Sequence, residues 1–572
     1  MENLYARLAP ALVTILELIL VASAGLLILW SRSRNQSLSK PSSFRSLKRA
    51  LNRLARRRAL SCFVVGGSVI AVRVALIPVL GVPQPRFHDE FSFLLAADTF
   101  AHGRITNPTH PMWMHFESFH IIWQPTYMSM YPPGGGLLLA AGQLLGQPWI
   151  GQLIAAGFMV SAICWMLQGW LPPPWALLGA TLAALRLAVL SYWVNSYFCG
   201  SLIAAAGALV LGALPRIWRH SRLRDIIAMG LGLAILANTR PYEGLIYSLP
   251  FAGALLFWAA TQKRFSRSTV ILHVMLPLFL ILGMTGFATS YYYWRVTGNP
   301  FVMPYQVNRQ AYAIAPYFVW QQARSEPPVY RHPVMEAFYK NSEPRDYEAG
   351  RTILGFAHRL AFRAKTLWLF YVGPILSIPL LALPCVFRDR KMRFPFLVVV
   401  AVMGGTALEV WTGAHYVAAA TGLLFLLLVQ SMRHLRVWRR ERGRLGEKIV
   451  RAVIFLCAAI VVLRVLLVAS GTVIEPTWPR GNLQRSAILK QLENMPGQQL
   501  VIVRYRSDHG IHNEWVYNRA DIDNAQVIWA RDMGEVENQE LIRYFKQRSA
   551  WLLDADETPP KLQPYVDANS RD

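Results

Sequence analysis

Charged residues are scarce in this 572-residue sequence: Asp, Glu, Lys and Arg make up only 16% of it, against about 25% in an ordinary soluble protein. Hydrophobic residues reach 54%, which is too many for a surface that faces water on all sides. Only five cysteines are present, each inside or beside an apolar run, which excludes a disulfide-rich secreted scaffold. The same composition excludes a disordered chain. It indicates an integral membrane protein.

Acidic residues are the scarcer of the two charged kinds, 32 against 58 Lys and Arg, so the net charge is +26. Five short segments between apolar runs hold 29 of the basic residues and three acidic ones, and so account for the whole excess. Cytoplasmic loops of membrane proteins are rich in Lys and Arg, whereas a nucleic-acid-binding protein gathers them on one soluble face. We therefore expect no nucleic-acid partner. The segments are 31–59, 216–224, 262–268, 388–393 and 433–451.

Apolar runs recur along the whole chain. A hydrocarbon core of about 30 Å requires about 20 apolar residues per helix. Threading the chain so that every basic segment lies on the cytoplasmic side predicts a mainly α, polytopic fold with about twelve transmembrane helices. The predicted spans are 10–30, 60–81, 149–169, 175–193, 200–216, 226–240, 244–261, 269–290, 366–387, 394–411, 415–432 and 449–470.

The threading leaves three long segments on the outer face of the membrane. Two of them are loops, 82–148 and 291–365, and both belong to a predicted transmembrane catalytic domain of residues 60–470. That domain follows an N-terminal helix and basic loop, residues 1–59, and precedes an outer C-terminal domain, residues 471–572. Within the C-terminal domain, helix-like stretches alternate with short apolar strands, which predicts a small α/β fold. We expect a bacterial inner-membrane protein whose outer segments face the periplasm.

An adjacent pair of carboxylates, Asp89 and Glu90, follows directly after the second predicted span. Two acidic residues at a membrane surface are costly to bury, so they need a partner or a role. In one interpretation Asp89 is a general base in a catalytic cavity, while Glu90 binds a metal ion or supports the loop. In the other, the pair is a solvated helix N-terminus, because acidic residues stabilise the first turn of a helix such as 91–103.

The residues after this pair favour the catalytic interpretation. A polar loop rich in proline and aromatic residues leads to Tyr131-Pro132-Pro133-Gly134-Gly135-Gly136 and a short apolar helix. Residues 60–260 resemble the GT-C superfamily of membrane glycosyltransferases, most closely the branch of protein O-mannosyltransferases and lipid A aminoarabinose transferases. The pair His415-Tyr416 gives weaker support. The resemblance implies a GT-C-like fold and a catalytic role for the Asp-Glu pair of the first outer loop. Flanking residues that we expect to bind substrate are Arg86, His88 and Tyr131.

A second motif, Arg240-Pro241, lies between two apolar segments. Members of the resembled family often carry a basic residue followed by proline at the corresponding turn. This implies that Arg240 holds the phosphate of the donor, and its planar guanidinium suits phosphate oxygens. An ion pair between Arg240 and Glu243 that stabilises a tight turn would explain the motif equally well.

Histidines are concentrated in the first outer loop, where five of the 13 lie within residues 88–120. His110 and His115 have four residues between them, a spacing that zinc sites permit. Together with Glu90 they are the candidate metal ligands. Without neighbouring cysteines the spacing is not specific, and loop histidines that stack or form hydrogen bonds explain it as well. We expect no required cofactor and leave a divalent cation open.

Other polar residues give weaker signals. In the second outer loop, Arg309, Arg331 and His332 stand beside aromatic and amide side chains, which suit sugar recognition and equally suit an ordinary polar lid. Glu17 and Arg73 are isolated ionisable residues within predicted spans. A mutual ion pair, snorkelling or separate helix contacts would each account for them.

The resemblance implies transfer of a sugar from a polyprenyl-phosphate donor to a periplasmic acceptor, which is a lipid, a glycan or a protein. The residues suit this chemistry, because the leaving phosphate needs a cation and the acceptor hydroxyl needs one base. Asp89 and Arg240 supply these two groups. Two alternatives remain: a non-catalytic envelope assembly or export factor with the same fold, and a secondary transporter, although a transporter's repeated halves are absent from the sequence.

Overall fold

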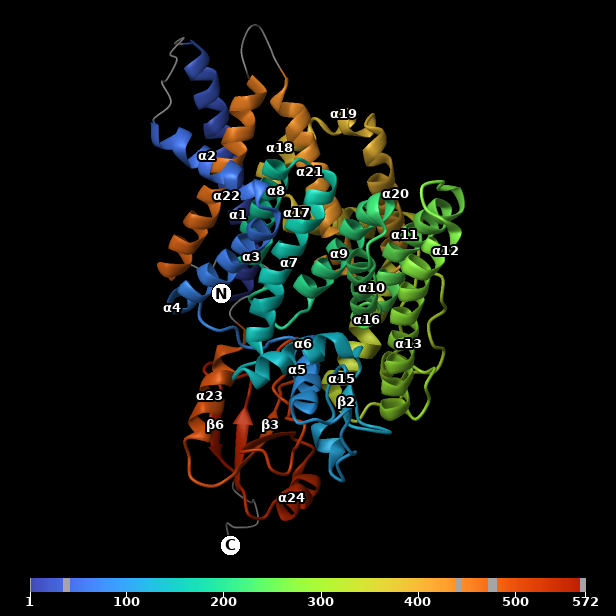
Figure 1. Ribbon diagram of the computed structural model, residues 1–572. Coiled ribbons are helices and arrows are strands. Elements are labelled where there is room, and N and C mark those ends of the chain that lie inside the picture. The colour runs from blue at the N-terminus through green and yellow to red at the C-terminus, as the bar shows by residue number, and fades with distance from the viewer. Residues whose placement is uncertain (1, 34–41, 439–444, 472–480, 566–572) are drawn as a thin grey trace.

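The structure, a computed structural model, describes residues 2–33, 42–438, 445–471 and 481–565. A bundle of helices forms one end of the molecule and a small β-sheet domain forms the other (Figure 1). Helices α5 (His88–Ala101) and α6 (Pro133–Leu144) of the first outer loop lie between these two parts. The prediction of a mainly helical membrane protein is confirmed.

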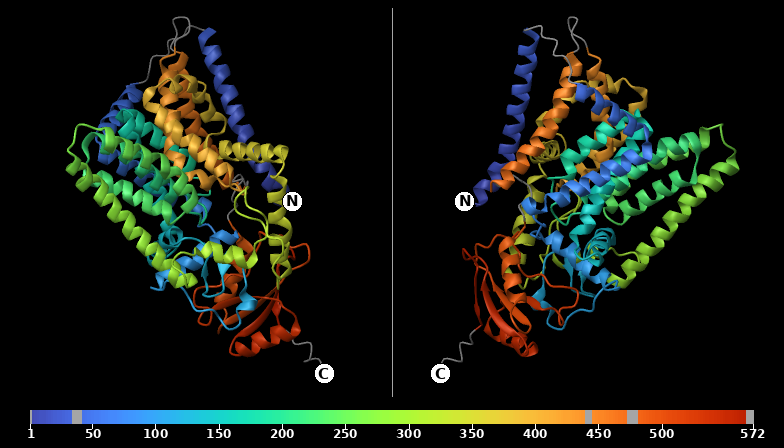
Figure 2. Two further views of the ribbon diagram at one scale, coloured as in Figure 1. Left: turned by 90° about the vertical axis from the view of Figure 1, so that its right-hand side faces the viewer. Right: turned by 60° about the vertical axis from the view of Figure 1, so that its left-hand side comes forward.

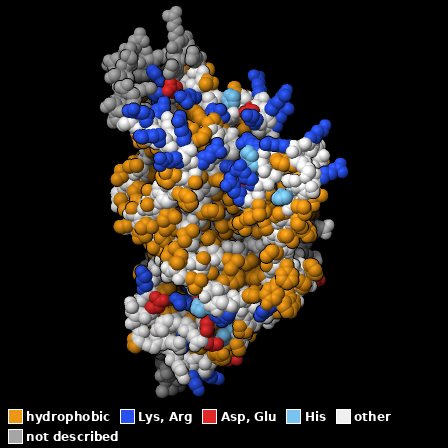
Figure 3. All heavy atoms as spheres, in the orientation of Figure 1, with side chains coloured by type: hydrophobic (Ala, Val, Ile, Leu, Met, Phe, Trp, Pro, Cys, Tyr) orange, Lys and Arg blue, Asp and Glu red, His pale blue; other side chains and the backbone are white. Residues whose placement is uncertain are grey.

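Eight helical segments of the described chain are long and apolar enough to cross a membrane. On the face seen in Figure 3, a wide band of hydrophobic side chains crosses the bundle, and Lys and Arg gather beyond its upper edge. This separation is the one that the charge pattern of the sequence predicts. The segments contain α1 (Glu2–Ser33), α3 (Arg58–Ala75), α7 (Trp149–Trp170), α9 (Gly200–His220), α11 (Pro241–Thr261), α12 (Arg267–Val270) with α13 (Leu276–Thr297), α21 (Thr421–Arg436) and α22 (Leu445–Ala469).

The other four predicted spans are helical but short or broken. The predicted span 175–193 contains α8 (Pro173–Ala183), whose 11 residues extend only about 16 Å. The predicted span 366–387 is divided at Gly373, whose φ of 62° is unfavourable for residues with a Cβ, and at Pro374, which lacks an N–H donor. The helices in these regions are α8, α10 (Leu223–Ala237), α17 (Ile353–Tyr371), α18 (Gly373–Leu380), α19 (Leu383–Phe387) and α20 (Arg393–Ala407).

Small residues allow the central helices to pack closely. A Cβ added to Gly66 of α3 would lie 2.6 Å from the carbonyl oxygen of Gly157 on α7. A Cβ added to Gly207 of α9 would lie 2.0 Å from the carbonyl oxygen of Ala419. Close backbone approach of this kind drives helix association in membranes, where lipid is as apolar as the side chains. These contacts hold α3 against α7, and α9 against the segment around Ala419.

The isolated charges of the membrane region find partners other than each other. Glu17 accepts a hydrogen bond from Nη1 of Arg186 at 2.6 Å, and not from Arg73. Arg73 instead donates to Oδ1 of Asn195 at 3.1 and 2.8 Å and to the carbonyl oxygen of Gly81 at 2.9 Å. A Glu17–Arg73 pair is therefore excluded, because each side chain reaches a partner on a helix or turn that the sequence does not place beside it.

The C-terminal part forms a four-stranded sheet with strand order β4-β3-β5-β6. Strand β3 is parallel to both of its neighbours, and β6 is antiparallel to β5. One face of the sheet, with Val501 and Trp529, packs on α23, and the other, with Leu500 and Ile528, packs on α24 and on the first outer loop. The elements are α23 (Leu483–Glu493), β3 (Gln499–Arg504), β4 (Val527–Arg531), α24 (Glu535–Tyr544), β5 (Ser549–Asp554) and β6 (Lys561–Pro564).

Short elements complete the outer loops. The predicted second loop, 291–365, contains the end of α13 at Thr297 and the start of α17 at Ile353. In both further views of the molecule the outer elements lie beside the C-terminal sheet (Figure 2). The remaining helices and strands are α2 (Ser42–Arg56), α4 (Ile77–Leu80), η1 (Trp113–Phe116), β1 (Ile121–Ile122), β2 (Met128–Ser129), η2 (Ala184–Ala188), η3 (Ile271–Met275), α14 (Pro304–Tyr312), α15 (Pro333–Glu336), η4 (Ala337–Ser342), α16 (Glu343–Ala349), η5 (Arg390–Met392) and η6 (Ala414–Ala420).

Candidate active site

The two adjacent carboxylates at the start of α5 point in different directions. The side chain of Asp89 keeps 26% of its surface exposed, whereas Glu90 is fully buried. Successive residues of a helix are turned by about 100° from each other, so one turn can present one acid to an opening and the other to the core. Only Asp89 is therefore accessible to a substrate.

Glu90 holds the backbone around Asp89. Its Oε2 accepts hydrogen bonds from the backbone N–H groups of Arg86 and Phe87, both at 3.0 Å. Its Oε1 accepts a third from the backbone N–H of Tyr197 at 3.1 Å. A buried carboxylate with three N–H donors is well stabilised as an anion. Glu90 thus ties the start of α5 to the irregular segment before α9.

Asp89 is surrounded by polar groups from distant parts of the first outer loop. Its Oδ1 accepts a hydrogen bond from the hydroxyl of Tyr131, and its Oδ2 lies 3.8 Å from Nδ1 of His120. His120 has a φ of 58°, a strained conformation for a residue with a side chain. Its carbonyl oxygen accepts hydrogen bonds from Ser92 Oγ at 2.6 Å and from the N–H of Met130 at 3.1 Å, which hold it in place. The loop is therefore built to bring His120 and Tyr131 to Asp89.

These neighbours keep Asp89 ionised. Burial alone would raise the pKa of Asp89, but His120, the Tyr131 hydroxyl and Arg240 together hold it below its usual value. Burial also raises the pKa of Tyr131 well above its usual value, so the phenol stays protonated and donates. A partly exposed, ionised carboxylate at neutral pH is the state that a general base requires.

Arg240 lies at the N-terminus of α11 and forms the ion pair with Glu243 that one interpretation of the sequence predicts. Its Nη1 donates to Oε1 of Glu243 at 3.2 Å, and its guanidinium lies over the ring of Tyr416, 4.4 Å from the centroid. Within the described chain, Nη1 is the one guanidinium nitrogen that has a hydrogen-bond partner. Arg240 is also close enough to Asp89 to stabilise its negative charge. It is both half of an ion pair and a cation beside the candidate base.

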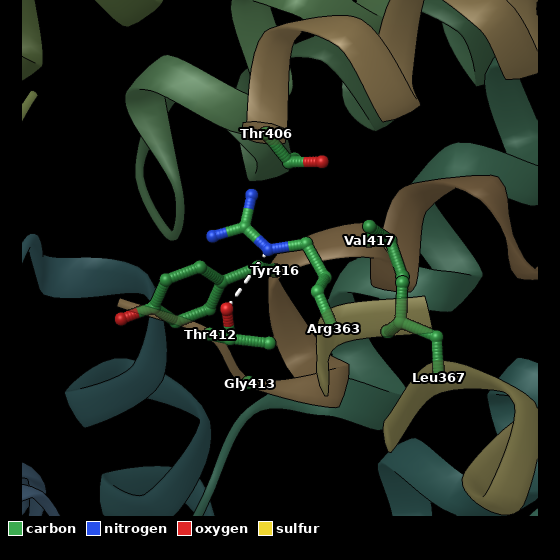
Figure 4. Close-up of a pocket in the computed structure, with 7 residues that line it drawn as sticks. All are labelled: Arg363, Leu367, Thr406, Thr412, Gly413, Tyr416 and Val417. Carbon is green, nitrogen blue, oxygen red and sulfur yellow. Dashed lines mark hydrogen bonds between the residues drawn. The ribbon is translucent and has the colours of Figure 1, made fainter. Parts of the chain in front are cut away.

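Arg363 and Glu409, which the sequence analysis missed, extend this cluster. Arg363 of α17 is 3% exposed, and it donates to Thr412 Oγ1 at 2.8 Å and to the carbonyl oxygens of Glu409 and Trp411. Its Nη1 and both carboxylate oxygens of Glu409 are buried without a hydrogen-bond partner in the described chain. Figure 4 shows Arg363 and Tyr416 together on the wall of a small hollow. A signal was present, because Glu409 is an ionisable residue within the predicted span 394–411.

The C-terminal domain also contributes to the surroundings of the site. His88 is buried, its Nδ1 lies 3.0 Å from the hydroxyl of Tyr517, and its ring lies 5.8 Å from that of His512. Arg86 donates to Oδ1 of Asn513 at 3.3 Å. The predicted substrate-binding residues Arg86 and His88 therefore contact the segment between β3 and β4.

The three candidates from the second outer loop lie in two places. Arg309 pairs with Glu343 at 2.8 Å, and its guanidinium lies 4.8 Å from the ring centroid of Trp411. Arg331 and His332 both approach the buried carboxylate of Glu117, each at 3.5 Å. Arg331 and His332 thus join the second outer loop to the first through Glu117, and neither contacts Asp89 or Arg240.

The candidate metal ligands do not converge. The described residues contain no group of three or more His, Cys, Asp or Glu side chains that could hold a metal ion. His110 lies 3.2 Å from Oδ1 of Asp523 and stacks on Phe545 of the C-terminal domain. His115 is buried in η1, which contacts β4 of that domain. The oxygens of Glu90 face backbone N–H groups. The described side chains do not form a metal site at these positions.

No family model and no curated protein matches the sequence. Solved structures with a similar fold include ArnT from Cupriavidus metallidurans bound to undecaprenyl phosphate, at 12% identity over 88% of this chain and 95% of that chain, with a TM-score of 0.48. They also include the oligosaccharyltransferase of Archaeoglobus fulgidus in its apo form, at 11% identity over 87% of this chain and 69% of that chain, with a TM-score of 0.47. Both are membrane glycosyltransferases of the GT-C superfamily, which the sequence also resembles. At TM-scores below 0.5 this likeness assigns no residue of the site.

Proposed function

We propose that this protein is a GT-C-type glycosyltransferase that transfers a hexose or pentose from a polyprenyl-phosphate donor to an acceptor hydroxyl or amine. The observation that carries the proposal is the placement of an accessible, ionised Asp89 beside the incompletely paired cation of Arg240. We place the site on the periplasmic face of a bacterial inner membrane, since the basic segments of the sequence favour the other face as cytoplasmic. The acceptor is a lipid, a glycan or a protein.

In the proposed step, an acceptor oxygen or nitrogen attacks the anomeric carbon of the donor sugar. The bond from that carbon to the phosphate oxygen breaks, and its electron pair leaves with the polyprenyl phosphate. The acceptor proton passes to Asp89, which is accessible and ionised. A general base contributes about a hundredfold to ten-thousandfold in rate. No protein acid is needed on the other side, because the leaving group is a stable anion.

The leaving phosphate gains negative charge as the bond breaks, and the site supplies cations to meet it. Arg240 uses one nitrogen for Glu243 and keeps the rest of its fork for phosphate oxygens. Arg363 is the second cation in this region. Tyr416 links it to Arg240, because Tyr416 lines the same small hollow as Arg363 and its ring lies under the guanidinium of Arg240. With two guanidinium groups in these positions, we propose that the transfer requires no divalent cation.

Glu90 and the remaining candidates have supporting roles in this proposal. Glu90 positions the base, because its three backbone contacts fix the turn that carries Asp89. Tyr131 orients the carboxylate through its hydroxyl. Arg86 and His88 join the first outer loop to the C-terminal domain, Arg309 pairs with Glu343, and Arg331 and His332 join the outer loops through Glu117.

The test is turnover by the purified, reconstituted protein with radiolabelled polyprenyl-phosphate sugars. We expect the wild type to release polyprenyl phosphate and Asp89→Asn to lose at least about a hundredfold in rate at an unchanged melting temperature. EDTA should leave the rate unchanged. Transport of an unmodified substrate, or full turnover by folded Asp89→Asn, would contradict the proposal. Turnover that stops with EDTA and returns with Mn²⁺ would contradict the metal-independent mechanism alone.

A further inference from the structure

A basic hollow lies at the end of the helical bundle opposite the candidate active site. Helix α10 begins at Leu223 on the rim of this hollow and ends at Ala237, close to Arg240, so the two sites occupy opposite ends of one helix. The hollow has a volume of about 420 Å³, which includes the space at its open mouth. Its lining comes from α3, α7, α9 and α10 and consists of Arg58, Gln168, Gly169, Arg216, Arg219, His220, Arg222, Arg224 and Asp225.

The charges of this lining are unbalanced. Five arginines face a single acid, Asp225, so the lining carries a net charge of +4 with His220 neutral. Within the described chain, Arg58, Arg219, Arg222 and Arg224 form no ion pair. Arg58 and Arg219 also lie close enough to Arg216 to repel its charge. Like charges held together at a surface without partners favour the binding of an anion.

The innermost arginine is held in place. Arg216 donates from Nη1 to the carbonyl oxygen of Gly212 at 2.6 Å and from Nη2 to that of Trp165 at 2.7 Å. Its guanidinium lies over the ring of Trp165, 4.0 Å from the centroid. Gly169 provides the room, because a Cβ there would lie 2.7 Å from Nη1 of Arg216. The hollow thus has a fixed cation at its base, while the side chains of Arg219, Arg222 and Arg224 are exposed at its mouth.

The surroundings indicate where the anion comes from. On α10, Leu223 and Ile227 are 52% and 41% exposed and lie one turn apart, directly beside the basic rim. On α3, which begins at Arg58, Phe63 is 77% exposed. Exposed apolar side chains beside a basic rim suit contact with the acyl chains of a bilayer. Basic pockets between transmembrane helices at this depth bind lipid headgroups.

We propose that this hollow binds the phosphate-bearing headgroup of an anionic lipid in the leaflet opposite the active site. The arginines contact the phosphate oxygens, and the acyl chains lie along the exposed apolar side chains of α10 and α3. This site is independent of glycosyl transfer, since it neither contains nor contacts Asp89 or Arg240.

The test measures lipid binding by native mass spectrometry of the full-length protein in detergent, titrated with cardiolipin. The site variant is Arg219→Gln/Arg222→Gln/Arg224→Gln, which removes three exposed charges and leaves the packed Arg216 untouched. The matched control is Lys263→Gln/Arg264→Gln/Arg267→Gln, which removes three exposed charges from another loop of the same basic face. We expect the site variant to bind cardiolipin at least about tenfold more weakly and the control to stay within about threefold of the wild type.

A second measurement separates a lipid from a free anion. In phosphatidylcholine nanodiscs, cardiolipin should raise the melting temperature of the wild type and of the control variant, but not that of Arg222→Gln/Arg224→Gln. Inorganic phosphate should leave the melting temperatures of all three proteins unchanged. Equal loss of cardiolipin in both triple variants would overturn the proposal, because general surface charge would then explain binding. Stabilisation by inorganic phosphate alone would overturn the assignment to a lipid.

Discussion

The hydroxyl of Tyr131 donates a hydrogen bond to Oδ1 of Asp89 and so joins the start of α5 to the segment that leads into α6. The phenol is buried and protonated, and the carboxylate is ionised and partly exposed. A donor that bonds the charged form of an acid lowers its pKa. The contact therefore sets both the direction and the ionisation of the proposed base.

Tyr131→Phe should move the acid limb of the pH–rate profile. Loss of the hydroxyl removes stabilisation of the carboxylate, so the pKa of Asp89 rises and the base is protonated at pH values where the wild type is still ionised. We expect kcat/KM to fall at a higher pH than in the wild type. Tyr127→Phe is the control, because its hydroxyl bonds the carbonyl oxygens of Asn518 and Arg519 instead. Identical acid limbs in all three proteins would remove Tyr131 from this role.

Glu90→Gln should affect folding more than chemistry. The amide would place an NH₂ group against backbone N–H donors that now face a carboxylate, a loss of about 1–3 kcal/mol for a buried group. We expect a lower melting temperature, with kcat of the remaining folded protein reduced far less than in Asp89→Asn. Thermal unfolding and kcat per folded molecule measure the two effects. A loss of kcat equal to that of Asp89→Asn at normal stability would make Glu90 catalytic.

Arg240→Lys should weaken use of the donor. Lysine keeps the charge but loses the planar fork that binds phosphate through two nitrogens, so we expect a rise in donor KM of about tenfold. Glu243→Gln removes the carboxylate that accepts from Nη1 and serves as the comparison. If Arg240 acts only as a structural partner, both variants lose stability alike and donor KM stays constant in the folded fraction. Melting temperature and donor KM, measured together, distinguish these results.

Arg363→Gln should also raise the donor KM. Its Nη1 is buried without a hydrogen-bond partner in the described chain, so a bound phosphate would gain a charge-assisted bond of about 1.5–3 kcal/mol. We expect a rise of about tenfold or more. Lys365→Gln removes an exposed positive charge two residues later on α17 and should leave KM within about threefold of the wild type. Equal KM values for the two variants would place Arg363 outside the phosphate site.

Arg531→Met should release the C-terminal domain from the first outer loop. Arg531 donates to Oε2 of Glu514 at 2.7 Å and to the carbonyl oxygen of Glu117 at 2.6 Å, and both side chains of the ion pair are buried. Leaving the Glu514 carboxylate buried without its partner lowers the stability of the folded protein by about 3–5 kcal/mol. Arg506→Met is the control, because it breaks an exposed pair with Asp508 that contributes at most about 1 kcal/mol. Limited proteolysis and thermal unfolding should separate the two. Equal melting temperatures would contradict the prediction.

The same pair makes stability dependent on pH. Burial alone would raise the pKa of Glu514, but Arg531 and the Tyr505 hydroxyl hold it below its usual value. Its contribution to stability is therefore complete above the pKa of the unfolded chain and is lost as the pH falls through the lower, folded value. Arg531→Met should lose this dependence, which melting temperatures measured across acidic pH will show.

The amino-acid sequence by itself determined the helical membrane class and the positions of most elements. These depend on local properties: an apolar run of sufficient length forms a helix in a bilayer, and basic loops mark one side of it. The Asp89-Glu90 pair and Arg240-Pro241 were recognisable for the same reason, because each is a short contiguous motif. The sequence also predicted that helices and short strands alternate in the C-terminal part, where the described chain has two helices and four strands.

The tertiary structure alone decided what each of these residues does. Asp89 and Glu90 are neighbours in sequence, yet packing exposes the first and buries the second against Tyr197. Glu17 pairs with Arg186 and not with Arg73, since helix packing brings together residues 169 positions apart. Such contacts depend on how close-packed helices and loops meet in space, which no local pattern of residues specifies.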